Sequence, residues 1–362
     1  MLIDRSRLVG FSLVLVLAAC TGPEKPTEPR SMVIDPARSG PSATGSDPIA
    51  AADRSPPGAG TGSDLYLVDP STGTTEPILV RHGPQEDPEP SPVGRRIVYQ
   101  SWTPGGEPQI FVLGGHGNVR QLTRMPGGAA DPTWSPDGSQ IAFAAAMGPT
   151  FTRDIFLMDA DGSHVRRLTG TAGQDDQPDW SPDGIHITFQ ARSTKALAYG
   201  LPRAQVWVAT VRDGELTLLI DDGSYWAGGD PAWSPDGRWI AYTALPGSSI
   251  NNRMPYAPLW IIRSDGTGRR TVHPWKKHWG LCEFGASWSP DGRSIAFIDR
   301  GGGSSQIGIL DVQTQKYAYL DVPGSDVSGW VFGLSWGRDG LVASVQKRGV
   351  RTPRPIDNGC YA

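Results

Sequence analysis

The motif Trp-Ser-Pro-Asp-Gly occurs four times in this 362-residue chain and constrains its fold more than any other feature. Its tryptophans are Trp134, Trp180, Trp233 and Trp288. Two degenerate copies flank them, aligned at Pro90 and Trp336, so that successive copies lie 44 to 55 residues apart. A repeat of about 40–50 residues is typical of one blade of a β-propeller.

Each copy reads as four short strands joined by turns. In the second copy, Ser-Pro-Asp-Gly predicts a turn, and the alternation Ile141-Ala-Phe143 after it predicts a strand. Residues 154–159 and 165–168, on either side of Asp161-Gly162, predict a hairpin. The many Gly (46) and Pro (33) residues also favour short strands over helices. The sequence therefore predicts an all-β protein, a six-bladed β-propeller with four-stranded blades.

The repeat region begins and ends with different halves of a blade. The region opens with an outer strand pair, 65–69 and 76–80, and it closes with an inner pair, 334–335 and 341–345. A closing blade built from both termini would complete the ring and leave no free sheet edge. We expect the propeller to span residues 63–347, followed by a C-terminal tail at 348–362.

The four Trp-Ser-Pro-Asp-Gly copies resemble the propeller repeats of the TolB-like family, over roughly residues 64–346. The resemblance implies a six-bladed propeller fold and says much less about function, because one fold hosts many functions. In TolB itself a separate mixed domain precedes the propeller, whereas only a linker is expected here.

The N-terminus resembles the signal peptide of bacterial lipoproteins. Arg5 and Arg7 precede the apolar run 8–19, which ends in Leu17-Ala-Ala-Cys20. The resemblance implies cleavage after residue 19, a lipid such as palmitate on Cys20, and a protein anchored to the extracytoplasmic side of a bacterial membrane. That side is the periplasmic face of an outer membrane in a diderm and the cell surface in a monoderm. An ordinary secretory signal is the alternative.

Residues 20–62 comprise Cys20 and a stretch rich in Pro, Gly, Ser and Ala. Such a composition buries too little apolar surface to order the chain, so we expect a disordered linker between anchor and propeller. Two further cysteines, Cys282 and Cys360, could form a disulfide in an exported protein or remain free thiols.

The sequence contains no convincing catalytic or metal-binding motif. Gly333-Leu-Ser335-Trp-Gly337 matches the nucleophile-elbow pattern, but the propeller repeat explains it better. The histidines show no zinc-type pair, so we predict no catalytic residues, no metal and no cofactor, although a cation such as calcium in the central channel stays open. The formal net charge of -4, without a basic run, argues against nucleic-acid binding.

One face of the propeller gathers candidate binding residues. The long connections, those between blades and between the second and third strands of a blade, should emerge together on this face, which we name the loop face; the Ser-Pro-Asp-Gly turns lie on the opposite, turn face. Loops on a rigid scaffold concentrate binding residues. The candidates are the acidic residues Asp87, Asp131, Asp176, Asp230 and Glu283 and the tryptophans Trp102, Trp226, Trp275, Trp279 and Trp330. Alternatively, the tryptophans pack the loops together and the aspartates before proline form turns.

Three functions are compatible with this pattern. The first is a non-catalytic, monomeric binding module for an envelope protein, peptide or glycan, touching the membrane only through its lipid anchor. The second is a structural or assembly component of an envelope complex. The third is a propeller lyase or hydrolase, which ranks last because the inner strands offer mainly Asp, Gln and Gly rather than a poised acid–base set.

Overall fold

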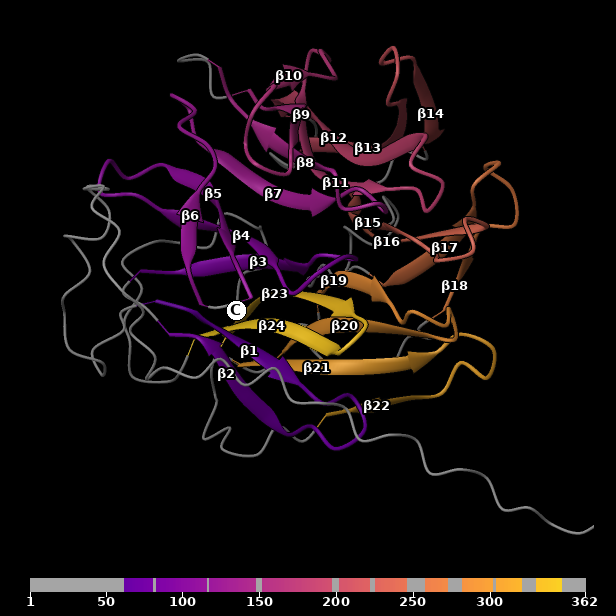
Figure 1. The fold of residues 1–362 in the computed structure, drawn as a ribbon. Coiled ribbons are helices and arrows are strands. Elements are labelled where there is room, and N and C mark those ends of the chain that lie inside the picture. Colours follow the sequence, from indigo (N-terminus) through magenta and orange to yellow (C-terminus); the bar gives the residue numbers. More distant parts are fainter. Residues whose placement is uncertain are drawn as a thin grey trace, which may run out of the picture. The chain divides into compact units, whose positions relative to one another are not determined.

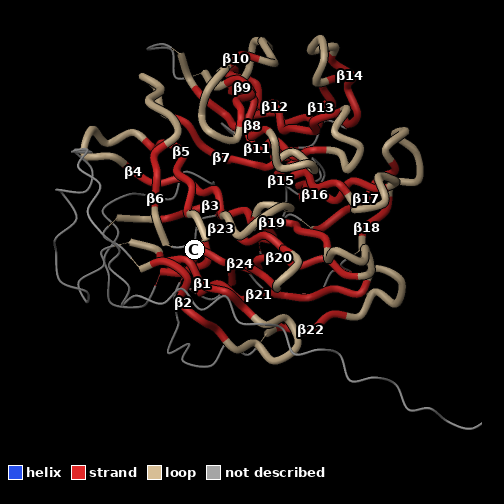
Figure 2. Tube along the Cα trace, viewed as in Figure 1, coloured by secondary structure: helices blue, strands red, loops and turns tan. Residues whose placement is uncertain are grey.

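The computed structural model describes residues 62–80, 83–115, 117–147, 152–196, 202–221, 225–245, 258–272, 282–301, 304–320 and 330–346, all within the compact unit Ile34–Ala362. Strand residues 193–196, 202–203, 225–228, 245, 282–284, 300–301, 304 and 330 are described for the backbone only. Every regular element in these ranges is a β-strand (Figure 2). None of the described residues belongs to a helix long and apolar enough to cross a membrane.

Blades 1 and 2 are antiparallel four-stranded sheets with the strands in chain order. Blade 1 contains β3 (Gln85–Pro90), β4 (Ile97–Trp102), β5 (Pro108–Leu113) and β6 (Val119–Gln121). Blade 2 contains β7 (Ala129–Trp134), β8 (Gln140–Ala145), β9 (Asp154–Asp159) and β10 (Arg166–Arg167). The repeat thus maps onto blades as the sequence predicts.

Blades 3, 4 and 5 repeat the same order. They contain β11 (Gln174–Trp180), β12 (His186–Ala196), β13 (Pro202–Thr210) and β14 (Leu216–Ile220); β15 (Tyr225–Trp233), β16 (Trp239–Leu245), β17 (Leu259–Arg263) and β18 (Arg270–Thr271); and β19 (Cys282–Trp288), β20 (Ser294–Gly301), β21 (Ser304–Asp311) and β22 (Tyr317–Tyr319). Strands β12 and β13 are longer than their counterparts in blade 2, and Arg203 of β13 pairs with Tyr225 of β15. This pairing joins blades 3 and 4 into one sheet.

The sixth blade is built from both ends of the chain, as predicted. Strands β1 (Asp64–Val68) and β2 (Thr75–Leu79) complete a sheet with β23 (Trp330–Gly337) and β24 (Gly340–Gln346). Asp64 to Val68 pair in antiparallel register with Val345 to Leu341. Figure 1 shows these indigo and yellow strands side by side. Six four-stranded blades therefore form the propeller.

The innermost strands surround the axis of the ring. Each of them contacts the inner strand of the next blade, in the order β3, β7, β11, β15, β19, β23 and back to β3. In blades 1 to 4 this strand carries a proline, Pro88, Pro132, Pro178 or Pro231. Proline donates no backbone hydrogen bond, and it is tolerated because an inner strand is a sheet edge, paired on one side only.

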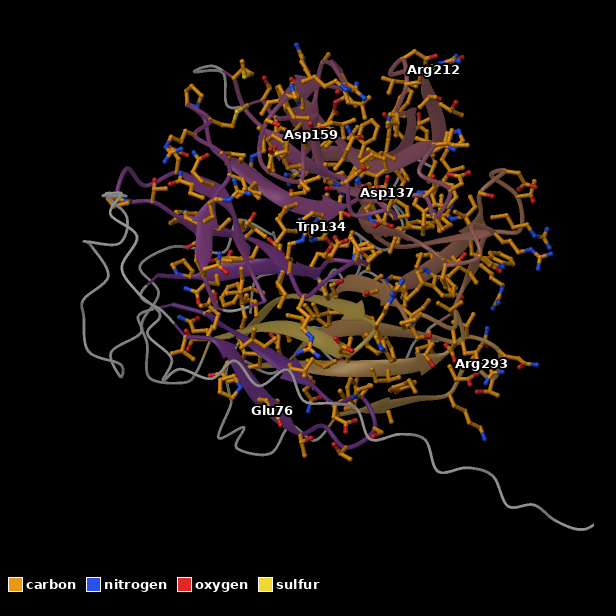
Figure 3. All side chains as sticks on the ribbon, in the orientation of Figure 1. Glu76, Trp134, Asp137, Asp159, Arg212 and Arg293 are labelled. Atoms are coloured by element: carbon orange, nitrogen blue, oxygen red, sulfur yellow. The ribbon has the colours of Figure 1, made fainter. Side chains whose placement is uncertain are left out.

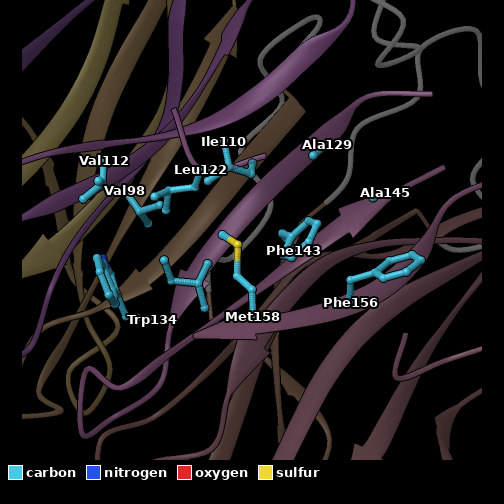
Figure 4. Close-up of a cluster of buried hydrophobic side chains, with 11 residues drawn as sticks. Val98, Ile110, Val112, Leu122, Ala129, Trp134, Phe143, Ala145, Phe156 and Met158 are labelled. Carbon is cyan, nitrogen blue, oxygen red and sulfur yellow. The ribbon is translucent and has the colours of Figure 1, made fainter. Parts of the chain in front are cut away.

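Hydrophobic side chains between neighbouring blades form the core. Val98 and Ile110 of blade 1 pack with Trp134, Phe143 and Met158 of blade 2, all of them buried (Figure 4). Burying one such side chain stabilises the fold by about 1.5–3 kcal/mol. The repeat tryptophan thus packs between blades and fixes the inner strands around the axis.

Candidate functional site

A cavity of about 1690 Å³ is lined by residues of the inner strands of all six blades. At the turn face its lining includes the prolines of the Ser-Pro turns, Pro92, Pro136, Pro182, Pro235 and Pro290. At the loop face its lining includes Trp102, Glu107, Arg153 and Arg192. The cavity is therefore the central channel of the propeller, and a ligand at the loop face would meet these last residues first.

Residues three positions before the repeat tryptophan form a ring in the channel wall, which we name the middle ring. Its members are Asp87, Asp131, Gln177, Asp230, Gly285 and Gly333. The first five have positive φ angles of 46°, 52°, 55°, 49° and 62°. Asp and Gly tolerate this left-handed conformation better than most residues. In each inner strand the pairing register shifts at this point, which indicates a β-bulge.

Side chains of the middle ring bind the backbone of the next blade. Asp131 Oδ2 accepts the Gln177 N–H at 3.2 Å, and Gln177 Oε1 accepts the Asp230 N–H at 2.9 Å. Asp230 Oδ2 accepts the Gly285 N–H at 2.6 Å. Asp131 and Asp230, two of the aspartates that the sequence singles out before proline, therefore hold neighbouring blades together.

Two further carboxyl groups line the channel two residues beyond the middle ring, towards the turn face. Glu89 Oε1 accepts the Trp134 N–H at 3.1 Å, and Asp179 Oδ2 accepts the Trp233 N–H at 2.6 Å. Burial raises the pKa of Glu89 to about 8, helped by the charge of Asp179, and burial raises the pKa of Asp179 to about 7. Neither residue was among the predicted binding residues, although each lies directly before the aligned repeat position, Pro90 for Glu89 and Trp180 for Asp179.

An ion-pair cluster lies at the loop-face end of the channel. Asp176 is buried and contacts two half-buried arginines, Arg153 from the segment before β9 at 3.3 Å and Arg192 of β12. Burial and the charge of Asp176 raise the pKa of the neighbouring Asp131 to about 6, against the charge of Arg153. Burial acts to lower the pKa of Arg153, but the charges of Asp176 and Asp131 raise it overall. Sequence reasoning missed both arginines.

The structure brings together five of the predicted binding residues. Asp87, Asp131, Asp176, Asp230 and the half-buried Trp102 all line the channel. Three others, Trp226, Glu283 and Trp330, are placed by their backbone only, on β15, β19 and β23.

The remaining predicted residues fall outside what the structure describes. Trp275 and Trp279 lie outside the described residues, as do Cys20 and Cys360. Cys282 begins β19 and is described for its backbone only. The lipid attachment and the disulfide therefore stay predictions.

The motifs weighed for catalysis and metal binding take ordinary places in the fold. Ser335 lies inside β23, an inner strand, rather than on the strand-to-helix turn of a nucleophile elbow. His164 is exposed on a turn and contacts Asp159 at 2.6 Å. Among the residues with described placement, no group of three or more His, Cys, Asp or Glu side chains could hold a metal ion.

Comparisons with known proteins agree with this architecture. A curated relative from Bacillus subtilis (strain 168), named "Uncharacterized peptidase YuxL", is 27% identical over 186 residues. The match covers 50% of this chain and only 25% of that protein.

Two solved structures share the fold. The putative TolB from Agrobacterium tumefaciens superposes with a TM-score of 0.60 at 17% identity, covering 78% of this chain and 96% of that one. TolB from Acinetobacter baumannii gives a TM-score of 0.53 at 19% identity, covering 79% of this chain and 63% of that one.

The family model of the TolB beta propeller domain matches residues 69–254, slightly more than half of the chain. This segment begins directly after β1 and ends at residue 254, between β16 and β17, and it includes three of the four complete repeats. The chain therefore belongs to the TolB β-propeller domain family.

Proposed function

We propose that this protein is a non-catalytic binding module whose ligand, an envelope protein, peptide or glycan, enters the channel from the loop face. The observation that carries this proposal is the channel of about 1690 Å³, with Trp102 and two half-buried arginines at its loop-face end. Concave sites that combine an aromatic anchor with a few fixed polar groups are typical binding sites.

The chemistry of the channel wall favours binding over catalysis. The carboxyl groups of Asp131, Asp230, Glu89 and Asp179 accept backbone N–H groups of the next blade. Groups engaged in this way act in blade-to-blade packing and are less available as a nucleophile or a general base. The relative named a peptidase gives little support for catalysis here, since the match spans a quarter of its length.

The binding function can be tested by affinity capture from envelope extracts of the source organism. We expect wild-type protein to retain a specific partner and Trp102→Ala to lose it. Trp239→Ala is the matched control, because Trp239 is also a half-buried tryptophan but follows the turn Asp236-Gly237 on the turn face. A partner retained equally by all three proteins would contradict the assignment to the loop face. Cleavage of peptides or glycans by the purified protein would contradict a non-catalytic role.

The membrane location is proposed from the N-terminal sequence. Leu17-Ala-Ala-Cys20 supports lipidation at Cys20 on the outer side of a bacterial membrane. We expect Cys20→Ser to move the protein from the membrane fraction to the soluble fraction after cell lysis. Wild-type protein that is itself soluble would contradict the anchor.

A further inference from the structure

We propose that Arg153 and Arg192 form a carboxylate-binding site at the loop-face end of the channel, which receives an acidic side chain of an extended peptide. The inference rests on the proposed binding function and names the chemistry that the ligand presents. Both arginines line the channel, and their side chains are 31% and 27% exposed, whereas that of Asp176 between them is 3% exposed. A ligand therefore reaches the guanidinium groups before it reaches Asp176.

The hydrogen bonding of Arg192 is incomplete. Its Nη2 contacts Asp176 Oδ2, but its Nε is buried and has no hydrogen-bond partner within the described residues. A buried donor without an acceptor costs about 1–3 kcal/mol. Arginine binds a carboxylate best through two parallel N–H groups, and Asp176 engages only one of those of Arg192. A second carboxylate, arriving from the channel, would contact the 27% of the Arg192 side chain that is exposed and engage guanidinium N–H groups that Asp176 does not use.

Charges deeper in the channel set how far an acidic side chain can enter. Beyond the arginine pair lies the middle ring, with the carboxyl groups of Asp87, Asp131 and Asp230. Like charges at this depth repel an incoming carboxylate, so it stops at the arginines. The arginine pair is therefore the deepest cationic contact for an acidic side chain that enters from the loop face.

Asp176 acts in this scheme as an internal competitor for the arginines. Around the pair, the charges of Asp176, Asp131 and Glu107 all act on Arg153. The positive charge of the arginines is thus already balanced in part by these carboxyl groups. A ligand carboxylate must therefore compete with Asp176 for the arginines. Modest affinity, with a strong dependence on salt, is the expected consequence.

The surroundings of the arginines favour a peptide over a sugar as the carrier of the carboxylate. Gln100, Gln174 and Gln190 line the same part of the channel. Gln100 Oε1 accepts the Asp131 N–H at 3.0 Å, which leaves its amide NH2 group to donate to a peptide carbonyl. An extended peptide can keep its backbone at Trp102 while a flexible glutamate side chain reaches inward. A phosphate group or the uronate group of a sugar could also supply the anion, and the experiment below distinguishes these ligands from an acidic peptide.

Titration calorimetry on the purified full chain at low salt tests the site. The ligands are a hexaglutamate peptide with blocked ends, the matching hexaglutamine peptide, a hyaluronan tetrasaccharide as the uronate source, and inorganic phosphate. We expect hexaglutamate to bind at least tenfold more tightly than the other three. Arg192→Gln and Arg153→Gln should each weaken it about tenfold, and Arg192→Lys should weaken it less than Arg192→Gln.

Asp176→Asn separates a ligand site from a structural ion pair. If Asp176 competes with the ligand, removing its charge should tighten hexaglutamate binding several-fold. Arg212→Gln is the control, since Arg212 is an 89% exposed arginine on the turn after β13, and it should change nothing (Figure 3). Thermal melts of every variant identify those that fail to fold. If Arg153→Gln or Arg192→Gln does not fold, Arg192→Lys and Asp176→Asn still test the site.

Several results would overturn the proposal. Hexaglutamate binding no better than hexaglutamine would do so, as would tighter binding of the tetrasaccharide or phosphate. Weaker binding by Asp176→Asn would assign the cluster a purely structural role. If hexaglutamate fails while partner capture still depends on Trp102, the carboxylate site is wrong and the binding module stands; if capture fails as well, both proposals fall.

Discussion

At the residue scale, the channel wall contains carboxyl groups whose ionised form is disfavoured. Glu89 has a pKa of about 8 because it is buried and lies near Asp179, whose own pKa is raised to about 7. In its protonated form Glu89 can still accept the Trp134 N–H, at 3.1 Å, and that bond joins blade 1 to blade 2. The protein thus keeps the inter-blade bond without a fully buried charge.

Glu89→Gln should therefore make the protein more resistant to a rise in pH. The pKa of Glu89 is about 8 in the folded chain, against a usual value of 4.5. Between these values the unfolded chain ionises while the folded chain keeps its proton, so stability falls as pH rises. Glutamine keeps the acceptor and removes the titration, and we expect it to stabilise the protein by about 1–3 kcal/mol at pH 8 relative to pH 5.

Urea unfolding of Glu89→Gln at a series of pH values measures this effect. The wild type should lose stability from about pH 5 to pH 8, and the variant should lose less. Glu76→Gln, an exposed substitution on β2 (Figure 3), is the control and should follow the wild type. Parallel curves for Glu89→Gln and wild type would show that Glu89 does not carry the proton.

At the element scale, the β-bulge in each inner strand explains both the success and the failure of sequence reasoning. Period-two alternation and the turn motifs predict the strands, because those signals are local. The bulge interrupts the alternation, so that Asp176, Gln177 and Asp179 all line the channel although they do not alternate. In a strand without the bulge, side chains would alternate between the two faces of the sheet, and at least one of these three would point away from the channel.

The ion pairs between blades, unlike the packing of the repeat tryptophan, could not be predicted from the sequence. Asp176 was predicted as a binding residue, but its partner Arg153 lies 23 positions earlier and in another blade. No local pattern encodes which arginine meets it. The prediction therefore found the acidic half of the cluster and not the basic half.

Gly333 tests the packing of the closing blade against blade 1. A Cβ atom at this position would lie 2.8 Å from Asp87 Cα and 2.9 Å from Asp87 N, both backbone atoms. Because backbone cannot yield as easily as a side chain, we expect Gly333→Ala to destabilise the protein by about 1–3 kcal/mol. Gly105→Ala is the control, since its Cβ would come no closer than 3.6 Å to any neighbour. Equal urea midpoints for the two variants would refute the close approach.

At the scale of the whole molecule, closure of the ring depends on two segments at opposite ends of the described chain. Leu65 and Val68 of β1 are buried, and their strand pairs with β24 along its whole length. The entropy of closing a loop grows only slowly with its length, about 0.6 kcal/mol for each doubling. A pairing between distant segments is therefore thermodynamically affordable, and it removes the sheet edge that β24 would otherwise expose.

Removal of β1 and β2 should open the ring. A chain that begins at residue 81 loses the partner strand of β24 together with buried Leu65, Val68 and Leu79. Burial of three such side chains corresponds to roughly 5–9 kcal/mol, which is comparable to the whole stability of a typical domain. We expect this truncation to abolish cooperative thermal unfolding and to promote association through the exposed edge, seen by gel filtration. A chain that begins at residue 62 is the matched control and should melt as the full chain does. If the shorter chain also unfolds cooperatively, within a few degrees of the control, then pairing of the two termini contributes little to the stability of the propeller.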